Sequence, residues 1–290
     1  MGQKDITEKI LEDYNDVFAD IINVLVFKGE RRINPSSLKD TSVHSMYKAD
    51  DSRLHEQERD ISKIWEEYNI EIAMCGIENQ TKVEAVMPLR VIGYEGASYR
   101  SQLLKDPIRP IPVITIVLYF GKEHWDKPKT LKELVKIPQG LDEYVNDCKI
   151  HVFEVSWLTE EQVSMFTSDF KVVANFFVNR RKNSDYIADD PTEIKHVDEV
   201  LKLLSVMTGD KRYETILKEE KEVRNMCEVA DRLENMGIAK GVAKGRAEGE
   251  TKLAKLMEKL FAAKRFEDAE KAASDEEARK KFYKEFGMVD

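Results

Sequence analysis

Two short runs of almost purely apolar residues constrain the fold of this chain more than any other feature. The runs are IEIAMCGI at residues 70–77 and IPVITIVLYF at residues 111–120. Both are too short to cross a bilayer, which takes about 20 residues in a helix. A short run that is apolar on both alternating faces is typical of a strand buried within a sheet. The sequence therefore predicts two buried strands, and the alternating residues 149–155 (KIHVFEV) predict a third.

Helix signals surround these strands. Apolar residues recur at helical spacing over residues 5–27, and Pro88 suits the first turn of a helix over residues 88–104. The polar residues 28–57 are expected to form an excursion on the surface. This order of elements predicts the α/β class, with a mixed sheet flanked by helices. The inward face of the second helix is expected to carry Leu89, Ile92, Gly93, Gly96 and Leu103.

Capping signals and proline usage divide the chain. Two pairs have the spacing of a capping box, Thr130 with Glu133 and Thr159 with Gln162. Asp190 and Pro191 predict the start of a helix that reaches about Met207. Pro191 is the last proline, and the chain beyond it has only helical signals. We therefore expect one α/β domain over residues 1–190 and an all-helical C-terminal region over residues 191–290.

The helical region contains a repeat of glycine, alanine and charged residues at 237–250, with a glycine at every fourth position. On a helix these glycines form a stripe of small side chains, which suits either a close helix–helix contact or a hinge of low complexity. Apolar residues follow the same helix and could form a seam for a partner helix. The stripe and the seam together predict a homodimer. The seam comprises Ile238, Val242, Leu253, Leu256, Met257, Leu260 and Phe261.

Charge and cysteine content bear on the partners of the protein and on the compartment in which it works. The formal net charge of −9 argues against a general nucleic-acid coat, although basic groups could still gather in one cleft. Three widely spaced cysteines suit reduced thiols, and the charged residues at the start lack a signal-peptide core. No run is long and apolar enough for a membrane helix. We therefore expect a cytoplasmic protein with no membrane partner.

Common catalytic motifs are missing, and one pattern of acids remains. The sequence has no phosphate-binding loop, no HExxH and no GxSxG, and its five histidines stand apart. Glu78 and Gln80 end the first apolar strand and share a face, and Asp60 lies in the polar segment before it. Two acids at a sheet edge could hold Mg²⁺, which needs only one or two carboxylates. Ordinary surface carboxylates would give the same pattern.

Several segments, spread in order through nearly the whole chain, carry a family resemblance. They are YNDVFADIINVL (14–25), LHEQERDISKIW (54–65), GIENQT (76–81), MPLRVIGYEGASYRSQLL (87–104), PVITIVLYFGKEHWDKPKTL (112–131) and the tail of glycine, alanine and charged residues. In these segments the sequence resembles the Rpn family of recombination-promoting nucleases, also described as YhgA-like transposases of the PD-(D/E)XK nuclease superfamily. The resemblance implies a restriction-endonuclease-like core built from a helix, a three-strand meander, a helix and a further strand.

The resemblance also implies a function and a site. The expected activity is that of a Mg²⁺- or Mn²⁺-dependent DNA endonuclease linked to recombination or mobile elements. Asp60 and Glu78 would hold the metal, with the carbonyl of Ile77. Gln80 stands where a lysine is usual and could orient a water molecule, without supplying a positive charge. An acid on the first helix would complete the site; Glu12, Asp16 and Asp20 are candidates, and Asp16 is favoured.

DNA binding requires basic side chains near this site. The expected contacts are Arg90 and Arg100 on the second helix, and the cluster Arg180, Arg181 and Lys182. Each of these residues could instead belong to a solvated helix face. Because Gln80 replaces a lysine, a second hypothesis remains open. The core could be catalytically inactive, and the chain could act as an oligomeric module that binds DNA or protein.

Overall fold

The computed structural model describes residues 11–41, 44–48, 54–58, 60–68, 70–218 and 223–288. The chain divides into two compact units, Met1–Ala230 and Asp231–Asp290. This division lies later in the chain than the change of composition near Asp190. The first unit contains the sheets and most of the helices, so it holds every residue that the sequence associates with a catalytic site.

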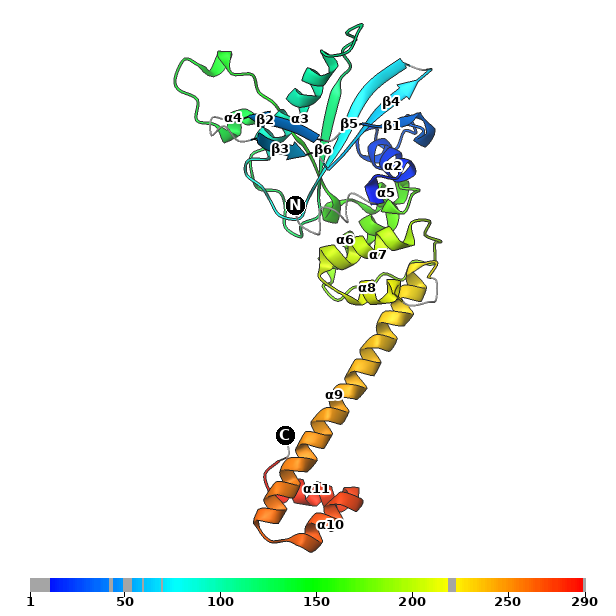
Figure 1. Ribbon diagram of the computed structural model, residues 1–290, viewed down its shortest axis with the longest axis vertical. Coiled ribbons are helices and arrows are strands. Elements are labelled where there is room, and N and C mark those ends of the chain that lie inside the picture. Colours follow the sequence, from blue (N-terminus) through cyan, green and yellow to red (C-terminus); the bar gives the residue numbers. More distant parts are fainter. Residues whose placement is uncertain are drawn as a thin grey trace. The chain divides into compact units, whose positions relative to one another are not determined.

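The core of the first unit is a five-stranded mixed sheet with the order β1-β4-β5-β6-β7 (Figure 1). Strands β1, β4 and β5 are antiparallel neighbours, whereas β5, β6 and β7 run parallel. The two apolar runs form β5 and β6, next to each other inside the sheet, as their burial on both faces predicted. The strands are β1 (Leu38–Asp40), β4 (Ile61–Glu67), β5 (Ile70–Gln80), β6 (Val113–Tyr119) and β7 (His151–Glu154).

The polar segment 28–57, which was expected to lie on the surface, also contains strands that its sequence did not predict. It contains a 3₁₀ turn (Pro35–Ser37), the edge strand β1, and the antiparallel pair β2 (His44–Lys48) and β3 (Leu54–Glu58). Strand β4 was also missed when the residues were considered by themselves, although the family resemblance implied a meander. Edge strands are short and need no continuous apolar run, because one side has no neighbouring strand. This explains why β1 was missed, whereas β4, which has strands on both sides, was missed because it follows a polar segment.

Helices cover both faces of the five-stranded sheet. On one face, the Lys63 ammonium of β4 lies 5.8 Å from the ring centroid of Phe18 in α2 (Asn15–Leu25). Helix α6 (Phe170–Lys182) packs beside α2. Glu78 in β5 points to the other face, where it contacts α3 (Met87–Gln102). The helix expected over residues 5–27 is interrupted by a turn at residues 13–14, and residues 1–10 lie outside the described part.

The buried face of α3 differs from the expected one. Met87, Val91 and Tyr94 are buried, whereas Leu89 and Leu103 are exposed. Met87 and Val91 pack with residues of β6 in a single apolar cluster that also contains Trp125. The prediction was wrong because α3 has apolar residues on more than one side, and periodicity within the helix does not show which side meets the sheet.

The two expected capping boxes are confirmed at Thr130 and Thr159. The helix expected to start at Pro191 begins later, at Val197. The main chain before it pairs with a distant segment instead: the N–H of Met226 donates to the carbonyl of Asp190, and the N–H of Ile194 donates to that of Arg224. The remaining elements of this unit are α4 (Leu131–Leu134), α5 (Glu160–Met165), α7 (Val197–Thr208), α8 (Arg212–Leu217) and the 3₁₀ turns Asp142–Tyr144 and Val155–Trp157.

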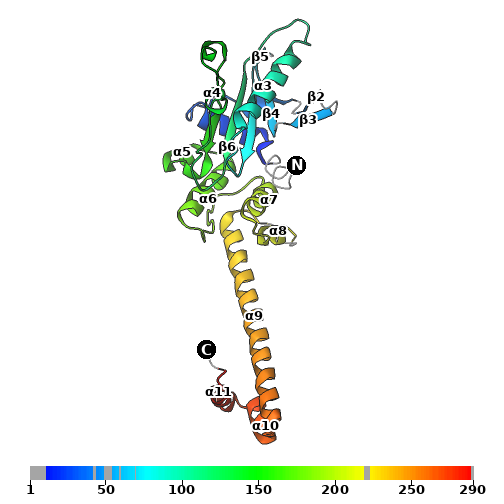
Figure 2. The same ribbon diagram turned by 90° about the vertical axis from the view of Figure 1, so that its left-hand side faces the viewer.

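The second unit is entirely helical in its described residues. It contains most of α9 (Met226–Ala262), followed by α10 (Phe266–Ser274) and α11 (Glu276–Glu285). Leu256 and Leu260 on α9 are fully buried against Ala269 and Ala272 of α10, and aromatic residues of α11 pack on the same cluster. Figure 2 shows α10 and α11 at the C-terminal end of α9.

This packing corrects the prediction for part of the seam, because Leu256 and Leu260 are covered within the chain, whereas Phe261 remains 52% exposed. The N-terminal half remains exposed at Ile238 and Val242. Among the described residues, every helix is too short or too polar to span a bilayer.

Candidate active site

Strand pairing brings the two predicted acids to one edge of the sheet. Ile61 of β4 pairs with Ile77 of β5, so Asp60, just before β4, lies beside Glu78. A carboxylate oxygen of Asp60 accepts a hydrogen bond from the main-chain N–H of Asn79 at 2.6 Å. The structure therefore brings together the two acids that the sequence pattern had already suggested as a pair.

Glu78 is held in a network of hydrogen bonds and charge. Only 1% of its side chain is exposed, and its Oε1 forms an ion pair with the guanidinium of Arg90. The same oxygen accepts weaker hydrogen bonds from Gln80 Nε2 at 3.4 Å and from the Tyr94 hydroxyl at 3.5 Å. A second nitrogen of Arg90 pairs with Glu84 at 2.7 Å. Burying a carboxylate is costly unless a countercharge accompanies it, and Arg90 supplies this charge.

The electrostatics of this network define its protonation states. Burial, followed by the charge of Glu78, raises the pKa of Tyr94 to about 12. The hydroxyl of Tyr94 is therefore neutral at physiological pH and can both donate and accept hydrogen bonds. Burial by itself would lower the pKa of Arg90, but Glu78 together with Tyr94 and Glu84 outweighs this effect and raises it. Arg90 is thus a permanent cation beside the predicted catalytic acid.

The acids of the first helical segment go to different places. Glu12 is fully buried and accepts a hydrogen bond from the side-chain amide of Asn79. Asp16, the favoured candidate, contacts His196 at 3.2 Å and Lys195 at 3.8 Å, so it joins α2 to the segment before α7. Asp20 accepts hydrogen bonds from the main chain at residues 167–168.

Glu12 is therefore the helix acid that reaches the end of β5. Side chains alternate along a strand, so Asn79 and its partner Glu12 lie on the opposite face of the sheet from Glu78 and Gln80. The contacts described for Asp16 do not bring it to Asp60 or Glu78.

The donor set suits a hard cation with few protein ligands. Asp60 and Glu78 offer carboxylate oxygens, and Ile77 lies next to Glu78 in the buried strand. The described residues contain no group of three or more His, Cys, Asp or Glu side chains placed to hold a metal ion. Mg²⁺ keeps several waters and needs only one or two carboxylates, so Asp60 and Glu78 would be sufficient protein ligands for it. Arg90 already occupies one oxygen of Glu78.

A second group of polar residues lies at the same edge of the sheet. In the parallel strands Gln80 is aligned with Tyr119, and Tyr119 with Glu154. After Glu154 the chain turns to Trp157, whose indole stacks on His124, with the ring centroids 3.7 Å apart. The Arg181 guanidinium lies 3.7 Å from the Trp157 ring centroid.

The predicted basic residues are divided between the two ends of the sheet. Arg181 donates to the carbonyl of Ser156 at 2.9 Å, so α6 delivers its basic end to the edge where Glu78 lies. The neighbouring Lys182 forms only an exposed pair with Glu160 at 3.4 Å. Arg100 is ten residues beyond Arg90 on α3, or about 15 Å along the helix axis. Arg100 therefore does not belong to the group around Glu78.

The residues that the sequence did not assign to the site are Tyr94 and Glu84. Tyr94 is buried, and its hydroxyl accepts a hydrogen bond from Arg90 at 2.8 Å. Arg90 and Tyr94 are four residues apart on α3, a spacing that places two side chains on one helix face. That spacing was a usable signal for the pair. The sequence carries no comparable signal for Glu84, which precedes α3.

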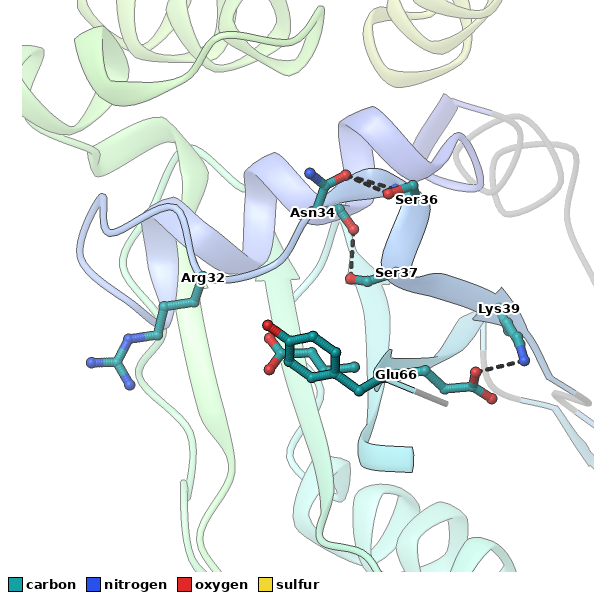
Figure 3. Close-up of a pocket in the computed structure, with 8 residues that line it drawn as sticks. Arg32, Asn34, Ser36, Ser37, Lys39 and Glu66 are labelled. Carbon is teal, nitrogen blue, oxygen red and sulfur yellow. Dashed lines mark hydrogen bonds and ion pairs between the residues drawn. The ribbon is translucent and has the colours of Figure 1, made fainter. Parts of the chain in front are cut away.

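A separate pocket of about 520 Å³ lies at the other end of β4 (Figure 3). Its cations are already paired with acids: Lys39 with Glu66 at 2.5 Å, and Arg32 with Glu30 at 2.7 Å. It lies at the opposite end of the strand from Asp60 and shares no residue with the acid pair. The pocket is lined by Arg32, Asn34, Ser36, Ser37, Lys39, Glu66, Glu67 and Tyr68.

Comparison with known families identifies the central part of the chain. Residues 71–203 match the family model described as "Putative transposase, YhgA-like". Over these residues the chain is similar to the YhgA-like putative transposases. The resemblance seen in the sequence is thereby confirmed over these residues. The matched segment includes Glu78, Gln80 and Arg90, whereas Asp60 precedes it. No curated protein and no solved structure matches the chain.

Proposed function

We propose that the chain is a metal-dependent DNA endonuclease that hydrolyses phosphodiester bonds in recombination or mobile-element activity. One observation carries the proposal: the fold brings Asp60 beside Glu78 at the edge of a mixed sheet, with Gln80 in contact with Glu78. Two acids and one polar side chain at a sheet edge can bind an ion and orient water beside a phosphate. The similarity to the YhgA-like putative transposases supports a role on DNA.

The proposed cofactor is Mg²⁺ or Mn²⁺. Asp60 and Glu78 would hold it, with the carbonyl of Ile77 as a third oxygen. When bound, such an ion acidifies a water molecule and stabilises negative charge on a phosphodiester. Gln80 would orient the attacking water through its amide, because glutamine can both donate and accept hydrogen bonds.

Plasmid cleavage tests the proposal directly. Purified protein is incubated with supercoiled plasmid and Mg²⁺ or Mn²⁺, and nicked and linear products are measured. Asp60→Ala and Glu78→Ala should each abolish cleavage. Glu67→Ala is the matched control, because it removes an exposed acid at the end of β4 that lies farthest from Asp60. Cleavage that survives both site substitutions would contradict the assignment.

A second function is favoured by a specific contact. Arg90 neutralises Glu78 in the structure, and Gln80 leaves the site without the usual lysine. A catalytically inactive core that binds DNA or protein would share both features. Gel-shift binding without cleavage, at every metal concentration tested, would support this alternative. The basic cluster Arg180, Arg181 and Lys182 would then provide the DNA contacts.

The proposed assembly is a homodimer through the second unit. Ile238 and Val242 on α9 are 58% and 68% exposed, which leaves apolar surface on the helix that carries the glycine stripe. A two-fold dimer would provide two cleavage sites for the two strands of a duplex.

A further inference from the structure

The contact between Arg90 and Glu78 indicates more than a structural ion pair. Glu78 is almost completely buried, whereas 34% of the Arg90 side chain is exposed. One partner is therefore fixed inside the site, and the other has a surface that a DNA phosphate can reach. Arg90 can therefore move to a phosphate at the surface, but the buried charge of Glu78 would then need another cation to compensate it.

Arg90 and a metal ion would compensate the same buried charge. The guanidinium occupies Glu78 Oε1 and lies next to the position that the proposed Mg²⁺ would take. A divalent cation would be repelled by the guanidinium and would also have to displace it from that oxygen. The pair therefore lowers the metal affinity of the protein for as long as Arg90 remains on Glu78.

The other contacts of Arg90 are suited to exchange. Glu84, its second carboxylate partner, is 33% exposed, and ion pairs of this kind contribute little to stability. The Tyr94 hydroxyl accepts hydrogen bonds from Arg90 Nη2 at 2.8 Å and Arg90 Nε at 3.2 Å, which orients the planar group. A phosphate can take the place of both carboxylates, because an arginine fork binds two phosphate oxygens at once.

We propose that Arg90 exchanges partners, from Glu78 in the protein alone to a backbone phosphate when DNA binds, and thereby couples metal loading to DNA binding. The inference rests on the proposed function. Tyr94 acts as a positioning residue that keeps the guanidinium at the edge of the site in both states. By linkage, DNA raises the affinity for the metal by the same factor by which the metal raises the affinity for DNA. A nuclease built in this way loads its metal chiefly on DNA.

Calorimetry measures this coupling without relying on activity. Mn²⁺ is titrated into the full-length protein with and without a short duplex whose phosphorothioate linkages resist cleavage. For the wild-type protein the duplex should tighten Mn²⁺ binding roughly tenfold, within the range of about 5–150-fold that is typical of allosteric coupling. Arg90→Gln should bind Mn²⁺ more tightly than wild type without DNA, and the duplex should then add little. Like Arg90→Gln, Tyr94→Phe should raise the affinity for Mn²⁺ without DNA and reduce the effect of the duplex, but by smaller factors.

Two controls make the result specific. Arg32→Gln removes an equal charge from a pair at the far pocket and should leave the coupling unchanged. Arg90→Lys keeps the charge if Arg90→Gln fails to fold, and it should weaken the coupling because lysine lacks the fork. Unchanged or weaker Mn²⁺ binding by a folded Arg90→Gln overturns the exchange but leaves the nuclease proposal standing. If the wild-type protein binds no Mn²⁺, with or without DNA, both proposals fail.

Discussion

The carboxylate of Asp60 accepts a hydrogen bond from the main-chain N–H of Asn79 at 2.6 Å, which ties the residue before β4 to the end of β5. The bond fixes Asp60 beside Glu78 through the backbone rather than through another side chain. Substitutions at Asn79 would therefore leave this bond in place, since every residue except proline carries the N–H. The position of Asp60 depends on the pairing of two strands, which the whole sheet supports.

Asp60→Asn removes the negative charge of Asp60 but keeps an oxygen that can accept the hydrogen bond from Asn79. The amide oxygen of asparagine can still accept from the N–H of Asn79, so the free energy of unfolding should fall by only about 1 kcal/mol or less. Plasmid cleavage should fall by at least about a hundredfold, because a neutral amide is a much poorer ligand for Mg²⁺. Urea denaturation and nicking rates measure the two effects. A large loss of stability together with retained cleavage would show that Asp60 is a structural residue.

Gln80 should affect the rate more than the affinity for the metal. Gln80→Ala removes the amide that contacts Glu78 at 3.4 Å but removes no charge. Cleavage should slow by about tenfold to a hundredfold, whereas Mn²⁺ affinity measured by calorimetry should stay within about twofold of wild type, since the amide contributes to catalysis through hydrogen bonding. A loss of Mn²⁺ affinity as large as that of Glu78→Ala would mean that Gln80 helps to hold the ion.

Gln80→Ala removes a polar group from this position, whereas Gln80→Lys adds a positive charge to it. The lysine adds the positive charge that the resemblance to PD-(D/E)XK nucleases leads us to expect here and should raise the cleavage rate if the rest of the site is intact. A lysine that leaves the protein inactive, while Mn²⁺ still binds, would favour the binding-module alternative over the nuclease.

The sequence predicted the candidate site only where polar side chains lie next to a recognisable apolar strand. Glu78 and Gln80 follow an apolar strand that is buried on both faces, so their position at a sheet edge could be inferred from the sequence alone. Asp60 could not be placed in this way, because β4 begins in a polar segment and its partner is defined by pairing across the sheet. The contacts of Glu12 and Asp16 could not be predicted for a similar reason. Both acids lie in the first helical segment, and only the tertiary structure shows that Glu12 contacts Asn79 whereas Asp16 contacts His196.

The helical region shows a similar limit. Its helical character followed from composition and the absence of proline, and it is confirmed. Which apolar residues face one another depends on the turns between α9, α10 and α11, so the sequence did not show that Leu256 and Leu260 are covered within the chain.

Glu154 should give the stability of the protein a dependence on pH. Burial alone would raise the pKa of this carboxyl, but hydrogen bonds from His124 at 2.6 Å and from the N–H of Trp125 at 2.9 Å lower it below its ordinary value. The stabilisation is therefore fully present above the ordinary pKa of glutamate, about 4.3, and is lost as the pH falls through the lowered value.

Urea denaturation of wild type and Glu154→Gln at several pH values tests this expectation. At pH 7 the variant should be less stable by about 1–2 kcal/mol, because it loses hydrogen bonds to a charged acceptor. The difference should shrink when both proteins are measured well below pH 4. A difference that stays constant with pH would show that Glu154 contributes through packing rather than through its charge.

The exposed apolar residues of α9 should mediate dimerisation. Ile238 and Val242 lie four residues apart on one helix face and are both largely exposed, whereas Leu256 and Leu260 are covered within the chain. Ile238→Glu together with Val242→Glu would place two like charges in a two-fold interface and convert a dimer to a monomer, since the same patch meets itself.

Lys244→Glu is the control, because it changes a charge on the same helix at a side chain that is 75% exposed and pairs with Glu248. Light scattering at micromolar concentration should show a dimer for wild type and for the control, and a monomer for the double variant. If wild type is already a monomer, α9 is not an oligomerisation helix, and a nuclease with this site would have to cut the two strands in separate events.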